Sequence, residues 1–197
     1  QRVAAADQVV DDLSLRAALF RATKDWERNT DLETTGAVLT RKRRTDGLEL
    51  EAAGRITERW EVFAGLALMD AEILKVAPGA DPRLKGQQPR NTPDYTFNLW
   101  TTYRFMPGWK AGLGAETKGE RYGYNPTAAN GPFVNGKFSP NVAPSYTRWD
   151  AMLAYEQPSY TVRMNVRNLF DKVYYDAIYE NGGFVDGIII DLVEEDR

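Results

Sequence analysis

Long segments in which apolar and polar residues alternate run through most of this 197-residue chain, and they restrict its fold more than any other feature. Alternation of this kind indicates β-strands with one apolar and one polar face. Most of the expected strands have about ten residues, the length that a tilted membrane-spanning strand needs. The expected strands are 13–22, 45–54, 60–70, 95–105, 109–118, 147–156 and 160–169, with an eighth near 185–193.

The connections between these strands alternate between short and long. The short turns are expected at 55–59, 106–108 and 156–159. The long segments are 24–44, 71–94, 119–145 and 171–186. Consecutive antiparallel strands place their connections at alternate ends of a sheet, so all long segments should lie at one end. Membrane β-barrels have this asymmetry, with short periplasmic turns and longer extracellular loops.

The two faces of the expected sheet differ in charge. One face carries no charged residue, as in the series Trp60, Val62, Ala64, Leu66 and Leu68. The opposite face carries charges of both signs, which a polar barrel interior could accommodate by pairing them across strands. Aromatic residues gather beside the short turns, as the aromatic girdles of membrane barrels do. These residues are Trp60, Tyr103, Phe105, Trp109, Tyr155 and Tyr160.

The pattern therefore predicts an all-β, antiparallel up-and-down transmembrane β-barrel. A soluble β-sandwich or a calyx-like module that binds a small molecule shows the same alternation, with its apolar face turned inward. That second reading stays open on the pattern alone. Solubility without detergent would distinguish the two.

Composition excludes several classes of function. Cysteine and histidine are both absent, which removes thiolate and histidine zinc sites and Ser-His-Asp catalysis from this chain. The net charge of −3 gives no basic surface of the kind that binds nucleic acid. Composition alone does not exclude carboxylate or hard-cation chemistry, so an outer-membrane enzyme of the small-barrel type stays a third reading. We predict that the chain is not an enzyme and has no catalytic residue, no metal site, no cofactor and no nucleic-acid partner.

Four short motifs occur in order along the chain. Residues 160–175 (YTVRMNVRNLFDKVYY) resemble the penultimate strand of the TonB-dependent outer-membrane receptors, with its N-(L/I)-F-(D/N)-x-x-Y-Y signature. Residues 43–51 (RRTDGLELE), 93–100 (PDYTFNLW) and 146–151 (YTRWDA) resemble three earlier strands. Each motif is short, and their common order makes the resemblance specific.

The resemblance implies seven or eight strands of a 22-stranded barrel with a plugged lumen. Residues 13–185 would be a C-terminal portion of the barrel, 1–12 are unassigned, and 186–197 are atypical because the family's last strand ends in an aromatic residue. The implied location is the bacterial outer membrane, in contact with its lipid. The implied function is uptake of a ferric siderophore, energised by the TonB–ExbB–ExbD complex through a plug domain that lies outside this chain. Iron would arrive already chelated, so no cofactor is expected.

The resemblance also implies where the ligand binds. Contacts in such receptors come from extracellular loops, and aromatic rings with arginine suit an anionic, aromatic ferric chelate, for which a catecholate is our hypothesis. The candidates are Arg121, Tyr122, Tyr124, Phe133, Phe138 and Tyr179. The residues of the family motif are expected to be architectural, with Asn168 ending its strand by bonding to local backbone. They are Asn168, Leu169, Phe170, Asp171, Tyr174 and Tyr175.

Overall fold

The computed structural model shows an antiparallel β-structure with one short 3-10 helix, η1 (Pro82–Leu84), in its described part. The predicted fold class is therefore confirmed. Within the described residues, no helix is long and apolar enough to cross a membrane. The structure describes residues 2–10, 12–30, 37–76, 78, 82–122, 133–134, 137–138, 142–179, 182–185 and 189–196.

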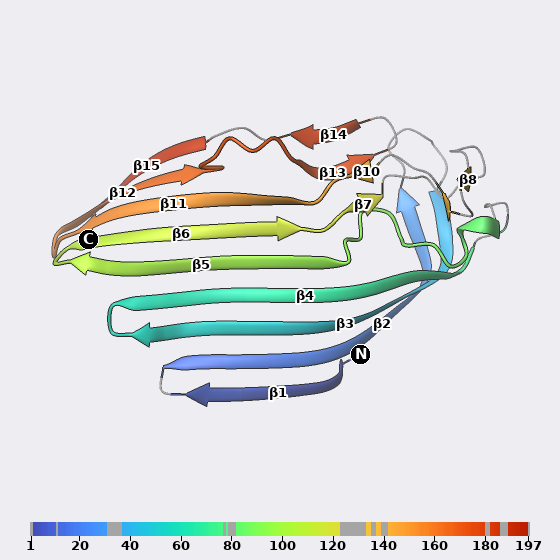
Figure 1. Cartoon of the computed structure of the whole chain (residues 1–197), viewed down its shortest axis with the longest axis horizontal. Coiled ribbons are helices and arrows are strands. Elements are labelled where there is room, and N and C mark those ends of the chain that lie inside the picture. Colours follow the sequence, from blue (N-terminus) through green and yellow to red (C-terminus); the bar gives the residue numbers. More distant parts are fainter. Residues whose placement is uncertain are drawn as a thin grey trace.

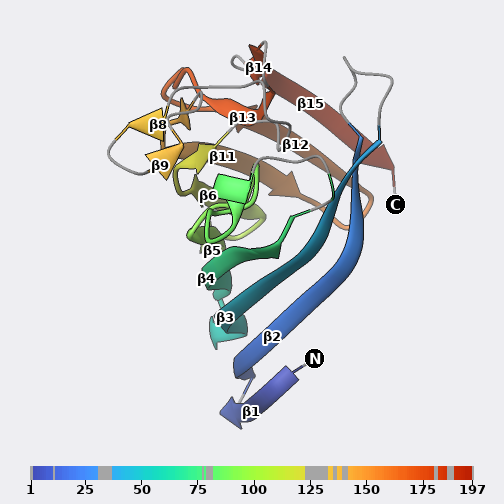
Figure 2. The same ribbon diagram turned by 90° about the vertical axis from the view of Figure 1, so that its right-hand side faces the viewer.

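Nine strands form one sheet in the order β1-β2-β3-β4-β5-β6-β11-β12-β15, each antiparallel to its neighbours (Figure 1). Its two outermost strands, β1 and β15, do not pair with each other, and the sheet is an open, strongly curved wall (Figure 2). The strands are β1 (Arg2–Val10), β2 (Leu13–Thr30), β3 (Ala37–Thr57), β4 (Trp60–Lys75), β5 (Tyr95–Met106), β6 (Trp109–Lys118), β11 (Tyr146–Glu156), β12 (Tyr160–Arg167) and β15 (Ile189–Asp196).

All long connections lie at one end of the wall and the short turns at the other, as predicted (Figure 1). Three small sheets lie in the long connections. They pair β7 (Arg121–Tyr122) with β10 (Val142–Ala143), β8 (Phe133–Val134) with β9 (Lys137–Phe138), and β13 (Tyr175–Tyr179) with β14 (Gly182–Val185). We call the end that carries them the loop end.

One part of the strand prediction was wrong, and one segment that the sequence left unassigned is a strand. The predicted long loop at 24–44 is mostly strand, because β2 and β3 stay paired in one register up to Thr30 opposite Ala37. These residues lack an apolar face, but a strand pair that projects into water needs none. Residues 2–10, which the sequence left unassigned, form the edge strand β1 along β2.

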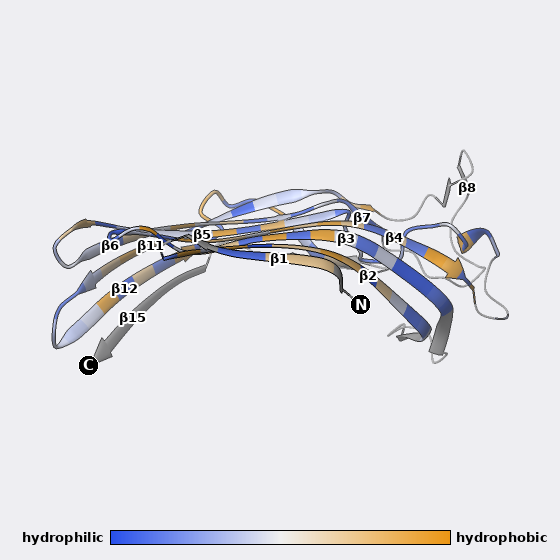
Figure 3. Ribbon diagram, turned by 90° about the horizontal axis from the view of Figure 1, so that it is seen from below, coloured by the Kyte–Doolittle hydropathy of each residue, from blue (hydrophilic) through white to orange (hydrophobic). Residues whose placement is uncertain are grey.

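The outward face of the wall is an apolar band of limited height. One row of cross-strand neighbours, Leu19, Leu48 and Leu68, ends the band at its loop side. The next outward-facing row is charged, with Arg21 opposite Asp46, and Figure 3 shows such changes of hydropathy along the strands. Trp60 to Leu68 covers nine residues of β4, within the about 9–11 that a tilted membrane-spanning strand needs.

Exposed leucines on this band distinguish a barrel wall from a soluble sandwich. Leu15, Leu19, Leu50 and Leu68 are 40–51% exposed to solvent. In a sandwich this apolar face would be covered by a second sheet, at a distance of about 10 Å. Lipid is the solvent that such a face fits, and this exposure disagrees with the soluble alternative.

An aromatic row follows the short-turn end of the band. The ring centroids of Phe105 and Trp109 are 6.5 Å apart, those of Trp109 and Tyr155 4.8 Å, and those of Tyr155 and Tyr160 6.4 Å. Trp60 joins the row and donates its indole N–H to Thr101 Oγ1 at 2.7 Å. Rings with an apolar body and a polar edge fit the membrane–water boundary.

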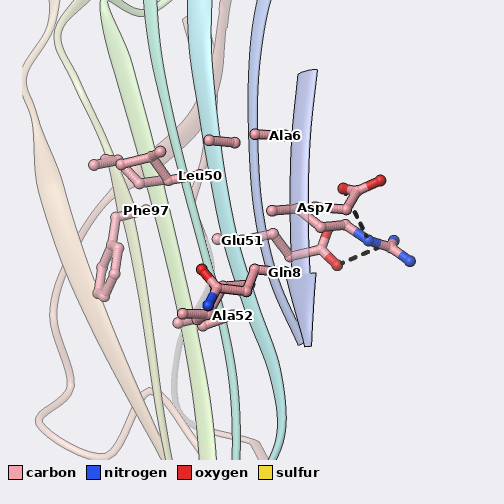
Figure 4. A pocket seen from close by; sticks show the side chains of 13 residues that line it. Ala6, Asp7, Gln8, Leu50, Glu51, Ala52 and Phe97 are labelled. Carbon is pink, nitrogen blue, oxygen red and sulfur yellow. Dashed lines mark ion pairs between the residues drawn. The ribbon is translucent and has the colours of Figure 1, made fainter. Parts of the chain in front are cut away.

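The inward face carries ion pairs between neighbouring strands. Arg16 lies 3.7 Å from Asp7 and 3.6 Å from Glu51, and both pairs are drawn in Figure 4. Further along the wall, Lys110 lies 2.6 Å from Glu156. The inward charges therefore compensate one another, as a polar barrel interior requires.

The two faces predict opposite responses to a new charge on the same strand. Ala64 faces outward near the middle of the apolar band, and Ala67 faces inward opposite Glu49. We expect Ala64→Arg to lower the unfolding free energy of the full-length protein in lipid by about 2–4 kcal/mol. Ala67→Arg should cost less than about 1 kcal/mol. Denaturant titration in phospholipid vesicles measures both, and equal costs would contradict the assignment of the faces.

Candidate functional site on the inward wall

A polar cluster lies on the inward face at the loop end, where β6 and β11 run side by side. The register pairs Tyr146 with Lys118 and Arg148 with Glu116. Because residues two apart on a strand share a face, Asp150 joins them. The motif segment 146–151 thus contributes every second residue to the cluster.

Arg148 is the centre of this cluster. Its Nη2 forms an ion pair with Glu116 Oε2 at 3.0 Å and donates to Asp150 Oδ2 at 3.1 Å. Its Nη1 donates to Tyr174 Oη at 3.1 Å. The guanidinium also lies 5.8 Å from the centroid of the Tyr174 ring. Two strands and the connection after β12 are therefore joined through one side chain.

Asn168 redirects the chain from β12 onto this cluster. It has a left-handed φ of 56°, and its backbone N–H donates to Asp150 Oδ1 at 2.8 Å. Its side chain accepts from Lys172 N at 2.9 Å and donates to Lys172 O at 3.0 Å. The side chain thus closes a tight loop that delivers the next residues to the inward wall, with Tyr174 97% buried.

Asp176, in β13, is held by two residues of the wall. Its Oδ1 accepts from Lys118 Nζ and lies 3.2 Å from Tyr146 Oη. The same hydroxyl lies 3.0 Å from Glu116 Oε1, so its single proton can serve either carboxylate. The hydrogen bond from Lys118 lowers the pKa of Asp176, and the charge of Arg121 acts in the same direction.

Arg121 lies beneath this contact and is only 2% exposed. Its guanidinium lies 5.4 Å from the centroid of the Tyr146 ring, and Nη2 donates to the backbone oxygen of Tyr175. The Tyr146 and Tyr174 rings are 4.5 Å apart. Arg121, Tyr146 and Tyr174 therefore form a buried layer that joins the wall to the connection after β12.

Arg121 and Tyr122 are the predicted ligand contacts whose side chains the structure describes, and they lie in different surroundings. Arg121 joins the cluster, whereas Tyr122 packs on Leu84 and donates to Glu120 Oε1 at 3.0 Å, and burial raises its pKa. Phe133 and Phe138 are opposite each other in β8 and β9, and Tyr179 ends β13. Tyr124 lies outside the described residues.

The motif residues lie where the chain leaves β12. Phe170 and Asp171 are exposed, Leu169 is half-buried, and Tyr175 is 39% exposed. Tyr174 is buried and contacts Arg148, so one motif residue belongs to the inward cluster. Both Asn168 and Asp171 have left-handed φ values, which asparagine and aspartate tolerate better than most residues.

Sequence reasoning missed most of the cluster. Lys118, Tyr146, Arg148 and Asp176 were not among the candidates. Glu116 and Asp150 belong to the charged face of the expected sheet, but they were not singled out as site residues. A signal for part of it was present, since Tyr146, Arg148 and Asp150 alternate within one motif. Nothing local indicated that Asp176 would reach the same place.

A separate hollow of about 500 Å³ lies on the outward face over β1 to β5. Small side chains form its floor, and Leu50 and Phe97 are among its walls (Figure 4). It belongs to the apolar band, where fluid hydrocarbon chains can fill it. The polar cluster on the inward wall is the better candidate for contact with a water-soluble ligand.

An open antiparallel wall with an apolar outer band, an aromatic row and a charged inner face defines this chain as part of an outer-membrane type of β-barrel. The family model described as "TonB dependent receptor-like, beta-barrel" matches residues 6–169. The chain belongs to this family of TonB-dependent receptor barrels, as its motifs predicted.

Known relatives are siderophore and metal receptors. The probable TonB-dependent receptor BfrD of Bordetella pertussis is 34% identical over 88% of this chain and 23% of its own length. The catecholate siderophore receptor Fiu of Escherichia coli K12 is 32% identical over 89% of this chain and 22% of its own length. The chain thus spans about a quarter of the length of these relatives.

Solved structures agree with this assignment. The siderophore receptor PiuA from Acinetobacter baumannii superposes with a TM-score of 0.74 at 27% identity, covering 96% of this chain and 27% of that one. The closed form of Fiu superposes with a TM-score of 0.72, covering 95% of this chain and 25% of that one. The described fold is therefore a segment of a receptor barrel.

The bend at Asn168 gives a stability prediction. Asn168→Ala removes both hydrogen bonds to Lys172. It also places alanine, which disfavours the left-handed region, at a φ of 56°. We expect a loss of about 2–3 kcal/mol in the unfolding free energy of the full-length receptor. Asn168→Gly keeps the backbone freedom and should lose about half as much. Denaturant titration measures both, and equal losses would contradict a role for the left-handed bend.

The lowered pKa of Asp176 gives a pH prediction. Because the folded-state pKa lies below the ordinary value of about 3.9, the ionised carboxylate contributes fully above about pH 4 and is lost as pH falls through the folded pKa. Amide exchange of β13, corrected for intrinsic rates, should therefore accelerate below about pH 4. Asp176→Asn should remove this pH dependence, and an unchanged profile in that variant would contradict the assignment.

Proposed function

We propose that this chain forms part of the wall of an outer-membrane receptor that imports a ferric siderophore and is energised through TonB. The observation that carries the proposal is the polar, aromatic cluster on the inward wall at the loop end, in a chain of the TonB-dependent receptor family. The names of the relatives support the substrate class.

The proposed orientation places the loop end outside the cell and the short turns in the periplasm. Long loops that meet water and ligand are typical of the extracellular side of such barrels. A ligand that enters from that side would meet β8–β9, β13–β14 and then the inward cluster. The ion pairs deeper along the wall would face the lumen or the plug.

The proposed transport needs no covalent chemistry from these residues. Iron would arrive already chelated, so the chain would act through selective binding and the receptor through rearrangement of its plug. The TonB–ExbB–ExbD complex would act on that plug, and lipid would contact the apolar band. The described residues contain no group of acidic side chains arranged to hold a bare metal ion.

Uptake of labelled iron tests this function. Cells lacking the gene for the full-length receptor should lose most uptake of the radioactive ferric complex of 2,3-dihydroxybenzoate, a catecholate, and regain it with the wild-type gene. A strain without TonB serves as the control and should take up none through this receptor. Unchanged uptake in the deletion strain would contradict the proposed substrate class.

A further inference from the structure

The carboxylate of Asp176 occupies a position that is built to hold an anion. Lys118 Nζ and Tyr146 Oη converge on its Oδ1, and Arg121 adds a second positive charge to its surroundings. Lys118 and Tyr146 are directly opposite each other on β6 and β11. Lys118 and Tyr146 thus belong to the wall, whereas Arg121 belongs to β7 in the connection after β6 and Asp176 belongs to the β13–β14 hairpin.

The donors exceed what Asp176 uses. Arg121 is only 2% exposed, yet its Nε and Nη1 have no hydrogen-bond partner among the residues that the structure describes. Buried N–H groups that stay unpaired lower stability. An anion with more oxygen atoms than one carboxylate could satisfy these donors, which makes the site better suited to a larger ligand than to its present occupant.

The occupant is also replaceable. The Asp176 side chain is 51% exposed, so its ion pair with Lys118 is screened by water and weak. The hairpin β13–β14 forms a sheet of its own and is not paired with the main wall. Side-chain contacts and the bond from Arg121 to Tyr175 O are therefore what fasten β13 to the wall among the described residues.

We propose that Lys118, Arg121 and Tyr146 form an anion subsite. Asp176 fills this subsite while the β13–β14 hairpin lies against the wall. An anionic oxygen group of the ligand replaces Asp176 as the hairpin moves away from the wall. This inference rests on the proposed function and specifies one contact of its ligand. The fitting ligand group carries negatively charged oxygen atoms, as a carboxylate or a catecholate does, because the subsite supplies two cations and a hydroxyl.

Chemical rescue in the full-length receptor tests the subsite without any siderophore. Asp176→Ala should speed amide exchange of residues 175–179 about three- to ten-fold, as expected for loss of one partly exposed ion pair. Acetate should restore slow exchange, whereas acetamide and sodium chloride at the same concentration should not. Acceleration without specific rescue by acetate would overturn the anion subsite.

Two controls separate the subsite from general loosening of the loop. Asp171→Asn changes an exposed carboxyl of the same connection and should leave exchange at the wild-type rate. Asp176→Ala combined with Lys118→Gln should lose the rescue by acetate, because the main cation is absent. Rescue that persists in the double variant would overturn the assignment of Lys118.

The ligand step has its own measurement. The ferric complex of 2,3-dihydroxybenzoate should speed exchange of residues 175–179 in the wild-type receptor at least about three-fold, because it lifts the hairpin. Unchanged exchange with a complex that the cells do take up would overturn displacement by ligand and leave the transport function intact. Absent uptake together with rescue by acetate would instead overturn the substrate class and support the anion subsite.

Discussion

Backbone hydrogen bonds constrain this wall more than any other interaction. In hydrocarbon each unpaired N–H or C=O costs several kcal/mol, so every membrane-spanning strand needs a partner on both sides. The described strands satisfy this from β2 to β12, and only the outer edges of β1 and β15 have no partner within the described sheet. Those two edges are therefore where the wall must join the rest of the barrel.

The same pairing fixes the inward cluster. A slip of one residue between β6 and β11 would turn Tyr146, Arg148 and Asp150 toward lipid and turn Trp149 inward. The apolar band, the aromatic row and the polar cluster thus depend on one register. That dependence explains how a site of charged residues is positioned precisely enough for binding although few of its side chains are fully buried.

The sequence predicted what depends on neighbours along one strand. The faces, the aromatic row and the end at which the loops lie follow from period-two alternation and from connection lengths. The sequence did not predict the full length of β2 and β3. Strands that project into water lose the alternation of apolar and polar residues while their backbones stay paired. The position of the Trp100 side chain could not be predicted either. It packs over Gly112 and Gly114 on the inward face, a contact that only the register between β5 and β6 creates.

Charge balance gives the loop end its special character. Elsewhere on the inward wall, carboxylates lie beside cations of neighbouring strands, as Asp7 and Glu51 do beside Arg16. The loop end has three cations, which are Lys118, Arg121 and Arg148. Their partners are two carboxylates of the wall, Glu116 and Asp150, and one carboxylate of the hairpin, Asp176. With the hairpin in place, the charges are balanced. When it lifts, three cations face two carboxylates, and the wall shows net positive charge toward the side from which an anionic ligand would enter.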